Sequence, residues 1–204
     1  MWIQVNGDRA LRRTFALCPA VLVSLVTLGC GHGSGPTAPD EVPASERAEH
    51  LAAMKNRLDD PPRLVPMTIA EVMALPTFPR NYTRSQLAEI SSIENRGVTV
   101  ASFVTRLRQM DDGDWHIQIT ESPVGCLRHD TVDQLITELT PGIRARKPAY
   151  TFEQLQALCG VPTQIRVSGW LLYDSPHKGD SGRGTPWEVH PVTRIEVCCW
   201  QELS

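Results

Sequence analysis

The pattern of apolar and polar positions divides the chain into an apolar run, a helical part and a strand-rich part. Residues 14–28 contain very few polar side chains. Weak helical stripes, bounded by proline or by capping residues, follow at 46–58, 68–75 and 83–93. From Gly97 onward the apolar positions follow the spacing of strands, so the pattern predicts a change from helical to β structure at this point.

The strand-rich part is predicted to contain five strands and one helix. The strands are expected at 98–107, 115–120, 132–139, 165–173 and 187–199. The helix is expected to begin after Thr151, where Gln154 completes a capping box, and to end before Gly160. This is the element order of an OB-fold, a five-stranded Greek-key barrel with a helix between strands 3 and 4. The predicted fold class is therefore mainly β, an OB-like barrel preceded by short N-terminal helices.

The start of the chain has the features of an export signal. Three arginines precede the apolar run 14–28, which is too short to span a bilayer comfortably. The run ends Thr27-Leu28-Gly29-Cys30, and this junction resembles the lipobox of bacterial lipoproteins, with Thr27 where leucine is usual. The resemblance implies a lipid on Cys30 and an anchor in the bacterial cell envelope. Because Gly31 follows the cysteine, it implies the outer membrane, facing the periplasm. Ordinary secretory cleavage beside an unrelated cysteine is the alternative.

Together these features predict four segments along the chain. They are a signal peptide at 1–29, a flexible linker at 30–45, a short helical segment at 46–96 and the barrel domain at 97–204. The linker is rich in small residues and proline, which bury too little apolar surface to become ordered. The signal peptide contains three Arg and one Asp, so its removal changes the net charge from −3 to −5. This acidity disfavours nucleic-acid binding, because neutralising phosphates requires Lys and Arg.

Cysteine usage fits an oxidising compartment. Without the signal peptide and the lipidated Cys30, four cysteines remain: Cys126, Cys159, Cys198 and Cys199. An even number permits disulfides, and four cysteines allow three pairings, among which the sequence does not choose. No CxxC spacing occurs in the chain, so the sequence gives no support for a zinc or redox site of that type.

Unusual polar residues gather near the ends of the predicted strands, where the loops of an OB-fold flank one binding surface. The candidate binding residues are Asp114, His116, Asp174, His177, Trp187, Glu188 and His190. Residues two apart on a strand point to the same side, which groups Asp114 with His116 and Glu188 with His190. Three histidines and three carboxylates are therefore expected in one neighbourhood.

Three interpretations of this neighbourhood remain open. Imidazole and carboxylate suit a divalent metal, and this interpretation assigns His116, His177 and His190 as ligands. The second interpretation is a hydrogen-bonded network that fixes the long loop before the last strand to the barrel. The third is binding of an organic ligand or a peptide. The cofactor is therefore unknown, with a divalent metal as the candidate.

The last third of the chain contains a long motif. It reads GWLLYD at 169–174, then His177, then WEVHPVT at 187–193. These residues resemble the GW…D…H…WEIHPVT signature of an uncharacterised family of bacterial secreted proteins with an OB-like fold, with Val189 in place of isoleucine. Shorter similarities lie upstream, at 114–116 and 138–141. The resemblance implies an OB-like barrel outside the cytoplasm and implies no reaction.

The expected function is that of an extracytoplasmic, lipid-anchored OB-fold module. It would bind an unknown small-molecule or protein ligand without catalysis. The first alternative is a metal-dependent hydrolase, in which the metal activates water and Glu188 or Asp114 acts as the base. The second alternative is a nucleic-acid-binding OB domain, which the net charge of −5 disfavours.

Overall fold

The computed structural model describes residues 40–126 and 134–198. The predicted signal peptide, Cys30, most of the predicted linker and Cys199 lie outside these residues. Among the described residues, no helix is both long enough and apolar enough to cross a membrane.

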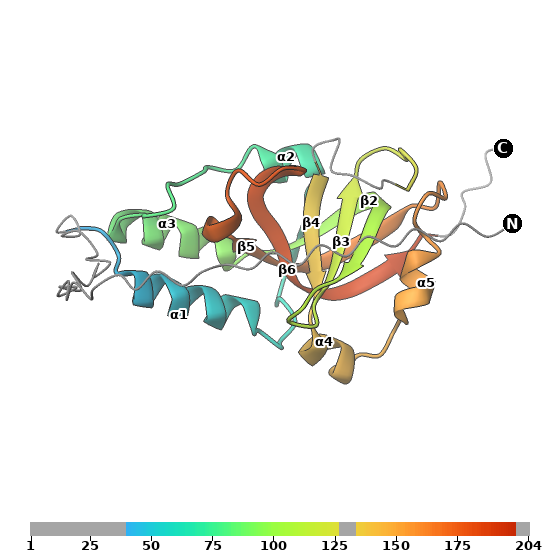
Figure 1. The fold of residues 1–204 in the computed structure, drawn as a ribbon, viewed down its shortest axis with the longest axis horizontal. Helices are drawn as coiled ribbons and strands as arrows, with labels where there is room; N and C mark the ends of the chain where they lie inside the picture. Colours follow the sequence, from blue (N-terminus) through green and yellow to red (C-terminus); the bar gives the residue numbers. More distant parts are fainter. Residues whose placement is uncertain (1–39, 127–133, 199–204) are drawn as a thin grey trace, which may run out of the picture. The chain divides into compact units, whose positions relative to one another are not determined.

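Six strands form one mixed sheet (Figure 1). They are β1 (Leu64–Pro66), β2 (Gly97–Gln109), β3 (Trp115–Thr120), β4 (Gln134–Leu139), β5 (Ile165–Tyr173) and β6 (Arg183–Val197). Their order is β1-β2-β3-β4-β6-β5, and β5 also pairs with β2. The pairs β1–β2 and β4–β6 are parallel, whereas the other pairs are antiparallel. The protein is mainly β, as predicted, with six strands where five were expected.

Strand β2 is long enough to serve several partners. Its residues 97–102 pair with β5, and its residues 103–109 pair with β3. Residues 97–99 also pair with β1, on the edge opposite β5. The pairings that run from β2 through β3, β4, β6 and β5 therefore return to β2.

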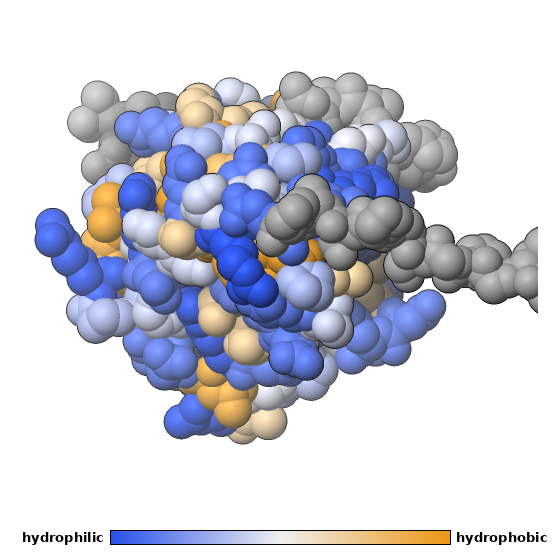
Figure 2. All heavy atoms as spheres, turned by 90° about the vertical axis from the view of Figure 1, so that its left-hand side faces the viewer, coloured by the Kyte–Doolittle hydropathy of each residue, from blue (hydrophilic) through white to orange (hydrophobic). Residues whose placement is uncertain are grey.

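Apolar side chains from every long strand meet in one core. The buried members on the strands include Val98, Val100, Val104, Ile117, Ile119, Leu135, Ile165, Val167, Leu171, Val189 and Val192. Strand β4 is buried at all six positions, so neither of its faces is solvated. Outside the core, the face drawn in Figure 2 is mostly hydrophilic, with apolar side chains in small separate areas.

Within residues 40–126 and 134–198, five helices accompany the sheet. They are α1 (Ala44–Lys55), α2 (Ile69–Met73), α3 (Arg84–Glu94), α4 (Pro141–Arg146) and α5 (Phe152–Gln156), and a 3-10 turn covers Ser175–His177. In Figure 1, α1 and α3 run side by side, joined by the contact of His50 Nε2 with Glu94 Oε2 at 2.6 Å. Capping boxes begin α2 at Thr68 and α5 at Thr151, as the sequence predicts.

Helix α4 was not expected from the sequence. Thr140 caps it, and Pro141 occupies its first turn, which is a usual place for proline.

Strand β6 begins at Arg183 rather than at 187, inside a segment that was expected to form a glycine-rich loop. Arg183 pairs with Gln134 of β4, and the Pro186 carbonyl accepts a hydrogen bond from the Asp174 amide. These tertiary pairings outweigh the local preference for a loop.

A disulfide joins Cys126 to Cys159, which is one of the possible links that the sequence left open. It connects the chain after β3 to the segment after α5, across a sequence separation of 33 residues. A cross-link closing a loop of this size typically stabilises a fold by about 2–4 kcal/mol. Gly160 has a φ of +80°, and a Cβ there would lie 3.1 Å from the Cys126 amide nitrogen. Cys198 is a free, half-buried thiol.

Strands β5 and β6 approach each other closely at Gly169. A Cβ at this position would lie 2.3 Å from the Pro191 carbonyl oxygen and 2.9 Å from Cγ1 of Val189. The glycine of the GW motif is therefore needed because β6 backbone occupies the place of a side chain.

We expect Gly169→Ala to lower the free energy of unfolding by about 1–3 kcal/mol, because the added methyl group displaces the β6 backbone. Urea denaturation measures the change. Gly142→Ala is the matched control, since its Cβ would clash with Cδ2 of Leu58, an exposed side chain that can rotate away, and would lie at ordinary van der Waals distance from Oγ1 of Thr140. Equal stability of Gly169→Ala and the parent protein would contradict this account.

Candidate functional site

Polar side chains from three neighbouring strands meet inside the sheet. Asp114 ends the turn before β3, His116 lies in β3, Glu138 in β4, and Glu188 and His190 in β6. His116 is directly opposite Glu138, and the parallel register of β4 with β6 brings Glu138 beside His190. With Asp174 and Arg183 these residues form the buried polar cluster, and the five named first are between 0% and 8% exposed.

Glu138 is the centre of this cluster. Its Oε1 lies 2.5 Å from Nε2 of His116, and its Oε2 lies 2.6 Å from Nδ1 of His190. The same Nδ1 lies 3.5 Å from Oε2 of Glu188, and Nε2 of His190 lies 3.8 Å from Oδ2 of Asp114. The two imidazoles therefore lie on either side of one carboxylate.

These contacts are short, but they do not have the angles of hydrogen bonds. Both carboxylate oxygens of Glu138 and both ring nitrogens of His190 are buried without a hydrogen-bond partner. Nδ1 of His116 and Oε2 of Glu188 are in the same state. Buried polar atoms normally have hydrogen bonds, so such a concentration of them in one place needs an explanation.

Arg183 holds the edge of the cluster nearest the loop after β5. Its guanidinium donates a hydrogen bond to Oε1 of Glu188 and lies 3.4 Å from Oδ2 of Asp174. Burial lowers the pKa of Arg183, but the charges of Glu188 and Asp174 raise it above its usual value. The guanidinium is therefore a permanent positive charge between two buried carboxylates.

The carboxylates respond differently to burial. Burial opposes the charged form of Glu138, but the imidazoles of His116 and His190 outweigh it and hold the pKa of Glu138 well below its usual range. Burial, together with the charge of Glu138, raises the pKa of Glu188. Burial lowers the pKa of His190, but Glu138 and Glu188 more than compensate and raise it to about 9. The cluster therefore favours the charged form of Glu138 and disfavours that of Glu188.

A lysine from the helical part of the chain, Lys55, interacts electrostatically with the carboxylates of the buried polar cluster. Burial lowers the pKa of Lys55, at the end of α1, yet the four carboxylates of the cluster raise it overall. Lys55 and Arg183 are thus two permanent positive charges facing four carboxylates.

The structure brings together most of the residues that the sequence singled out. Asp114, His116, Glu188 and His190 all belong to the cluster, and Asp174 is at its edge. His177 is further out: its ring is 50% exposed, and its Nδ1 lies 2.6 Å from Oδ2 of Asp174.

Trp187 also belongs to the predicted set, and it packs in the core. Its side chain is fully buried, with the ring 4.9 Å from that of Tyr173. Its Nε1 donates a hydrogen bond of 2.9 Å to the Pro76 carbonyl. The indole therefore connects β6 to the chain between α2 and α3.

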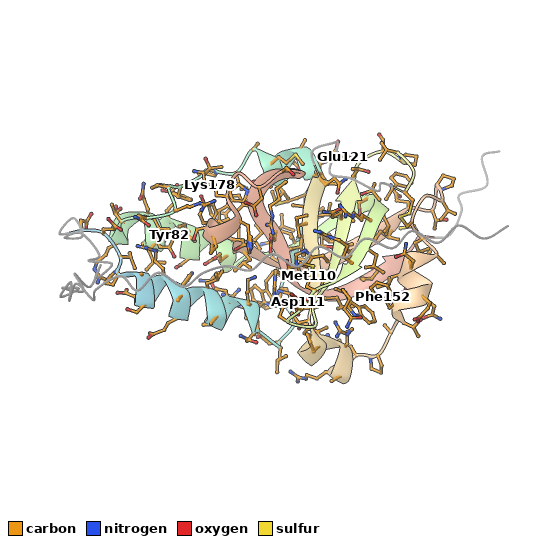
Figure 3. The ribbon with its side chains drawn as sticks, in the orientation of Figure 1. Tyr82, Met110, Asp111, Glu121, Phe152 and Lys178 are labelled. Carbon is orange, nitrogen blue, oxygen red and sulfur yellow. A yellow bond between two sulfur atoms is a disulfide. The ribbon has the colours of Figure 1, made fainter. Side chains whose placement is uncertain are left out.

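Sequence reasoning did not include Glu138, Arg183 or Lys55 in the site. Glu138 was visible only as part of a family-like motif, and Arg183 stood in a presumed loop. The best available signal was Glu138 itself, the one charged residue of the segment that forms β4. In Figure 3 the side chains at the centre of the sheet come from several strands, whereas Lys178 and Tyr82 lie among the helices.

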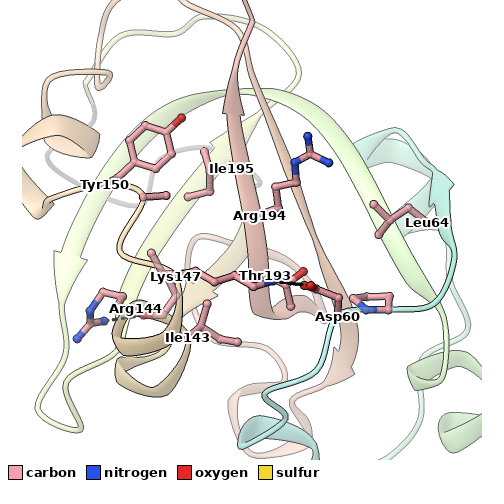
Figure 4. A pocket seen from close by; sticks show the side chains of 12 residues that line it. Asp60, Leu64, Ile143, Arg144, Lys147, Tyr150, Thr193, Arg194 and Ile195 are labelled. Atoms are coloured by element: carbon pink, nitrogen blue, oxygen red, sulfur yellow. Dashed lines mark hydrogen bonds and ion pairs between the residues drawn. The ribbon is translucent and has the colours of Figure 1, made fainter.

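A cavity of about 380 Å³ lies apart from the cluster (Figure 4). Its apolar wall is formed by Leu139, Ile143, Tyr150 and Ile195. The Lys147 ammonium crosses it to pair with Asp60. No histidine, no cysteine and no member of the buried polar cluster is among its lining residues.

We expect Arg183→Met to lower the free energy of unfolding at pH 7 by about 3–5 kcal/mol, because it leaves two buried carboxylates without their positive partner. Arg194→Met is the control: Arg194 also lies in β6 and contacts a glutamate, Glu196, at 2.7 Å, but both side chains are exposed. That exposed pair is worth less than about 1 kcal/mol. Similar losses in the two variants, measured by urea denaturation, would show that the buried charge is unimportant.

Comparisons with known proteins assign no family. No protein-family model matches the chain, and no curated protein matches it. Among solved structures, the chain is similar to OBody AM3L09 bound to hen egg-white lysozyme, with 16% identity and a TM-score of 0.35 over 59% of this chain and 92% of that one. It is also similar to asparaginyl-tRNA synthetase of Entamoeba histolytica, with 12% identity and a TM-score of 0.30 over 50% of this chain and 20% of that one. Values at this level assign neither a family nor a function.

Proposed function

We propose that this chain is an extracytoplasmic, lipid-anchored module with an OB-like barrel, which binds a ligand without catalysing a reaction. The ligand is a small molecule or an apolar group presented by another protein. The proposal combines the apolar N-terminal run, the strand pairing and the placement of the cavity.

The strand pairing supports the OB-like part of the proposal. Five strands, β2 to β6, pair in the order β2-β3-β4-β6-β5 and return to β2. The parallel pair β4–β6 joins the third and fifth of them, and helices α4 and α5 lie between the third and the fourth. This order supports the proposal of a five-stranded Greek-key barrel, to which β1 would be an added edge strand.

The separation of the cavity from the buried polar cluster is the observation that carries the proposal. The cavity has the volume and the apolar wall of a small-molecule site, but its one carboxylate, Asp60, is paired with Lys147. The cluster has the residue types of a catalytic site, but His190 and Glu188 are fully buried. Binding therefore fits this arrangement better than hydrolysis, which requires substrate at the chemical groups.

The nucleic-acid alternative has weaker support. The cations at the cavity are already engaged: Lys147 pairs with Asp60, and Arg144 donates hydrogen bonds to the carbonyls of Leu139 and Gly113. Phosphate binding depends on cations that are free to replace counterions.

A neutral apolar fluorophore, N-phenyl-1-naphthylamine, tests the cavity. We expect saturable binding to the folded protein, and we expect Ala149→Trp to weaken it at least fivefold, because Ala149 lines the cavity and the indole fills it. Fluorescence titration measures the affinity.

Ala145→Trp is the matched control for this titration. Ala145 is also exposed and precedes Ala149 by four residues, but it is not among the lining residues. Its affinity for the fluorophore is expected to equal that of the parent protein. Non-saturable binding, or equal affinities in both tryptophan variants, would refute a binding role for this cavity.

Replacing the proposed lipidation site tests the anchor. In bacterial cells, we expect Cys30→Ala to move the protein from the membrane fraction to the soluble fraction, because one thiol carries the lipid. Cys18→Ala is the control, since Cys18 lies within the apolar run and is removed with the signal peptide in this proposal. Unchanged membrane fractionation of Cys30→Ala would exclude the lipid anchor.

A further inference from the structure

We propose that Asp114, Glu138 and His190 bind one divalent transition-metal ion, and that zinc fits the donor set best. The ion would tie β6 to β4 and to the turn before β3. This inference goes beyond the proposed ligand-binding function, because it concerns the buried polar cluster rather than the cavity, and either can hold without the other.

The three side chains offer donors that converge on a single point. One ligand atom from each of Asp114, Glu138 and His190 lies within 4.8 Å of the other two. Zinc binds nitrogen and oxygen at about 2.0–2.2 Å, and tetrahedral geometry places two such ligand atoms about 3.3–3.6 Å apart. Side-chain movements on the order of 1 Å therefore suffice to form the site.

The missing hydrogen bonds point to the same ligand. His190 is 0% exposed and Glu138 is 1% exposed, and neither has a hydrogen bond to any of its four side-chain nitrogen and oxygen atoms. Donors that coordinate an ion direct their lone pairs at the ion rather than at one another. Short contacts with angles unsuited to hydrogen bonds are what such a shared centre produces.

The composition of the cluster favours a cation. Four carboxylates, those of Asp114, Glu138, Asp174 and Glu188, lie near only two permanently charged side chains, Arg183 and Lys55. Burying carboxylates is costly unless a positive partner lies close to them, and a bound cation would supply such a partner.

The neighbouring residues act as positioning residues rather than ligands. His116 contacts Oε1 of Glu138 and thereby orients the carboxylate. Glu188, itself bonded to Arg183, lies 3.5 Å from Nδ1 of His190 and is placed to fix the imidazole. Carboxylates that orient a metal-bound histidine in this way are a common feature of metal sites. This ligand set differs from the His116, His177 and His190 set that the sequence indicated, because His177 faces Asp174 at the outer edge.

Metal content is the first test. The full-length protein, purified without chelator and dialysed, is expected to contain about one equivalent of zinc by elemental analysis. After removal of the zinc with a chelator, cobalt(II) is expected to restore one equivalent and to produce visible d–d absorption bands. Less than a tenth of an equivalent of zinc, and no cobalt spectrum, would overturn the proposal.

Variants then test which residues are the ligands. We expect Asp114→Asn and Glu138→Gln to lower zinc affinity at least tenfold, measured by competition with a chromogenic chelator. Asp114 is slightly exposed and the change is isosteric, so this variant is expected to fold even if Glu138→Gln does not. His177→Ala is the matched control and is expected to bind zinc like the parent. An equal loss in His177→Ala and Asp114→Asn would overturn the proposed ligand set.

Thermal unfolding separates this site from the cavity. Zinc at 100 times its dissociation constant is expected to raise the melting temperature of the metal-free protein by at least about 5 °C. The Asp114→Asn variant is expected to show less than half of that rise, and Ala149→Trp all of it. A zinc-dependent rise of the same size in Asp114→Asn would overturn the proposal, whereas weak fluorophore binding would affect only the cavity.

Discussion

The buried carboxylate of Glu138 imposes the strongest constraint on this fold. A charge in the middle of a strand that is buried on both faces is tolerated only with positive or polarisable neighbours close by. The β3–β4 register supplies His116, and the β4–β6 register supplies His190. A shift of either strand by one residue would turn these imidazoles to the opposite face, so the polar cluster and the sheet register depend on each other.

Local sequence patterns explain much of the fold, and tertiary pairing explains the rest. Capping boxes at Thr68 and Thr151 mark helix starts because the cap is a local interaction. Strand β1 has only three residues, and it forms by pairing with residues 97–99 of β2, which are far from it in the sequence. No local pattern reveals such an edge strand, so the predicted number of strands was one too low.

The polar cluster was predictable where its members lie two residues apart along the chain or, like Asp174, directly follow a strand. The spacing of two residues links Asp114 to His116 and Glu188 to His190, so the sequence found those pairs. Glu138 lies next to these residues because of strand pairing, and Lys55 because of the packing of α1. Neither relation produces a periodic pattern in the sequence. Arg183 was left out for a different reason. The glycines and the proline around it are typical of a loop, so the first residues of β6 were not predicted as a strand.

Strand β2 also affects how the molecule reaches this structure. Its pairing with β5 joins residues 63 to 73 positions apart, from Ser102 with Ile165 to Gly97 with Trp170. Closing so long a loop costs chain entropy before any contact repays it, whereas the β2–β3 hairpin needs only a short turn. The hairpin is therefore available early in folding, and the return of β5 to β2 comes late. Until β5 arrives, the N-terminal half of β2 exposes unpaired backbone, so the chain reaches its native state slowly and in an order set by topology.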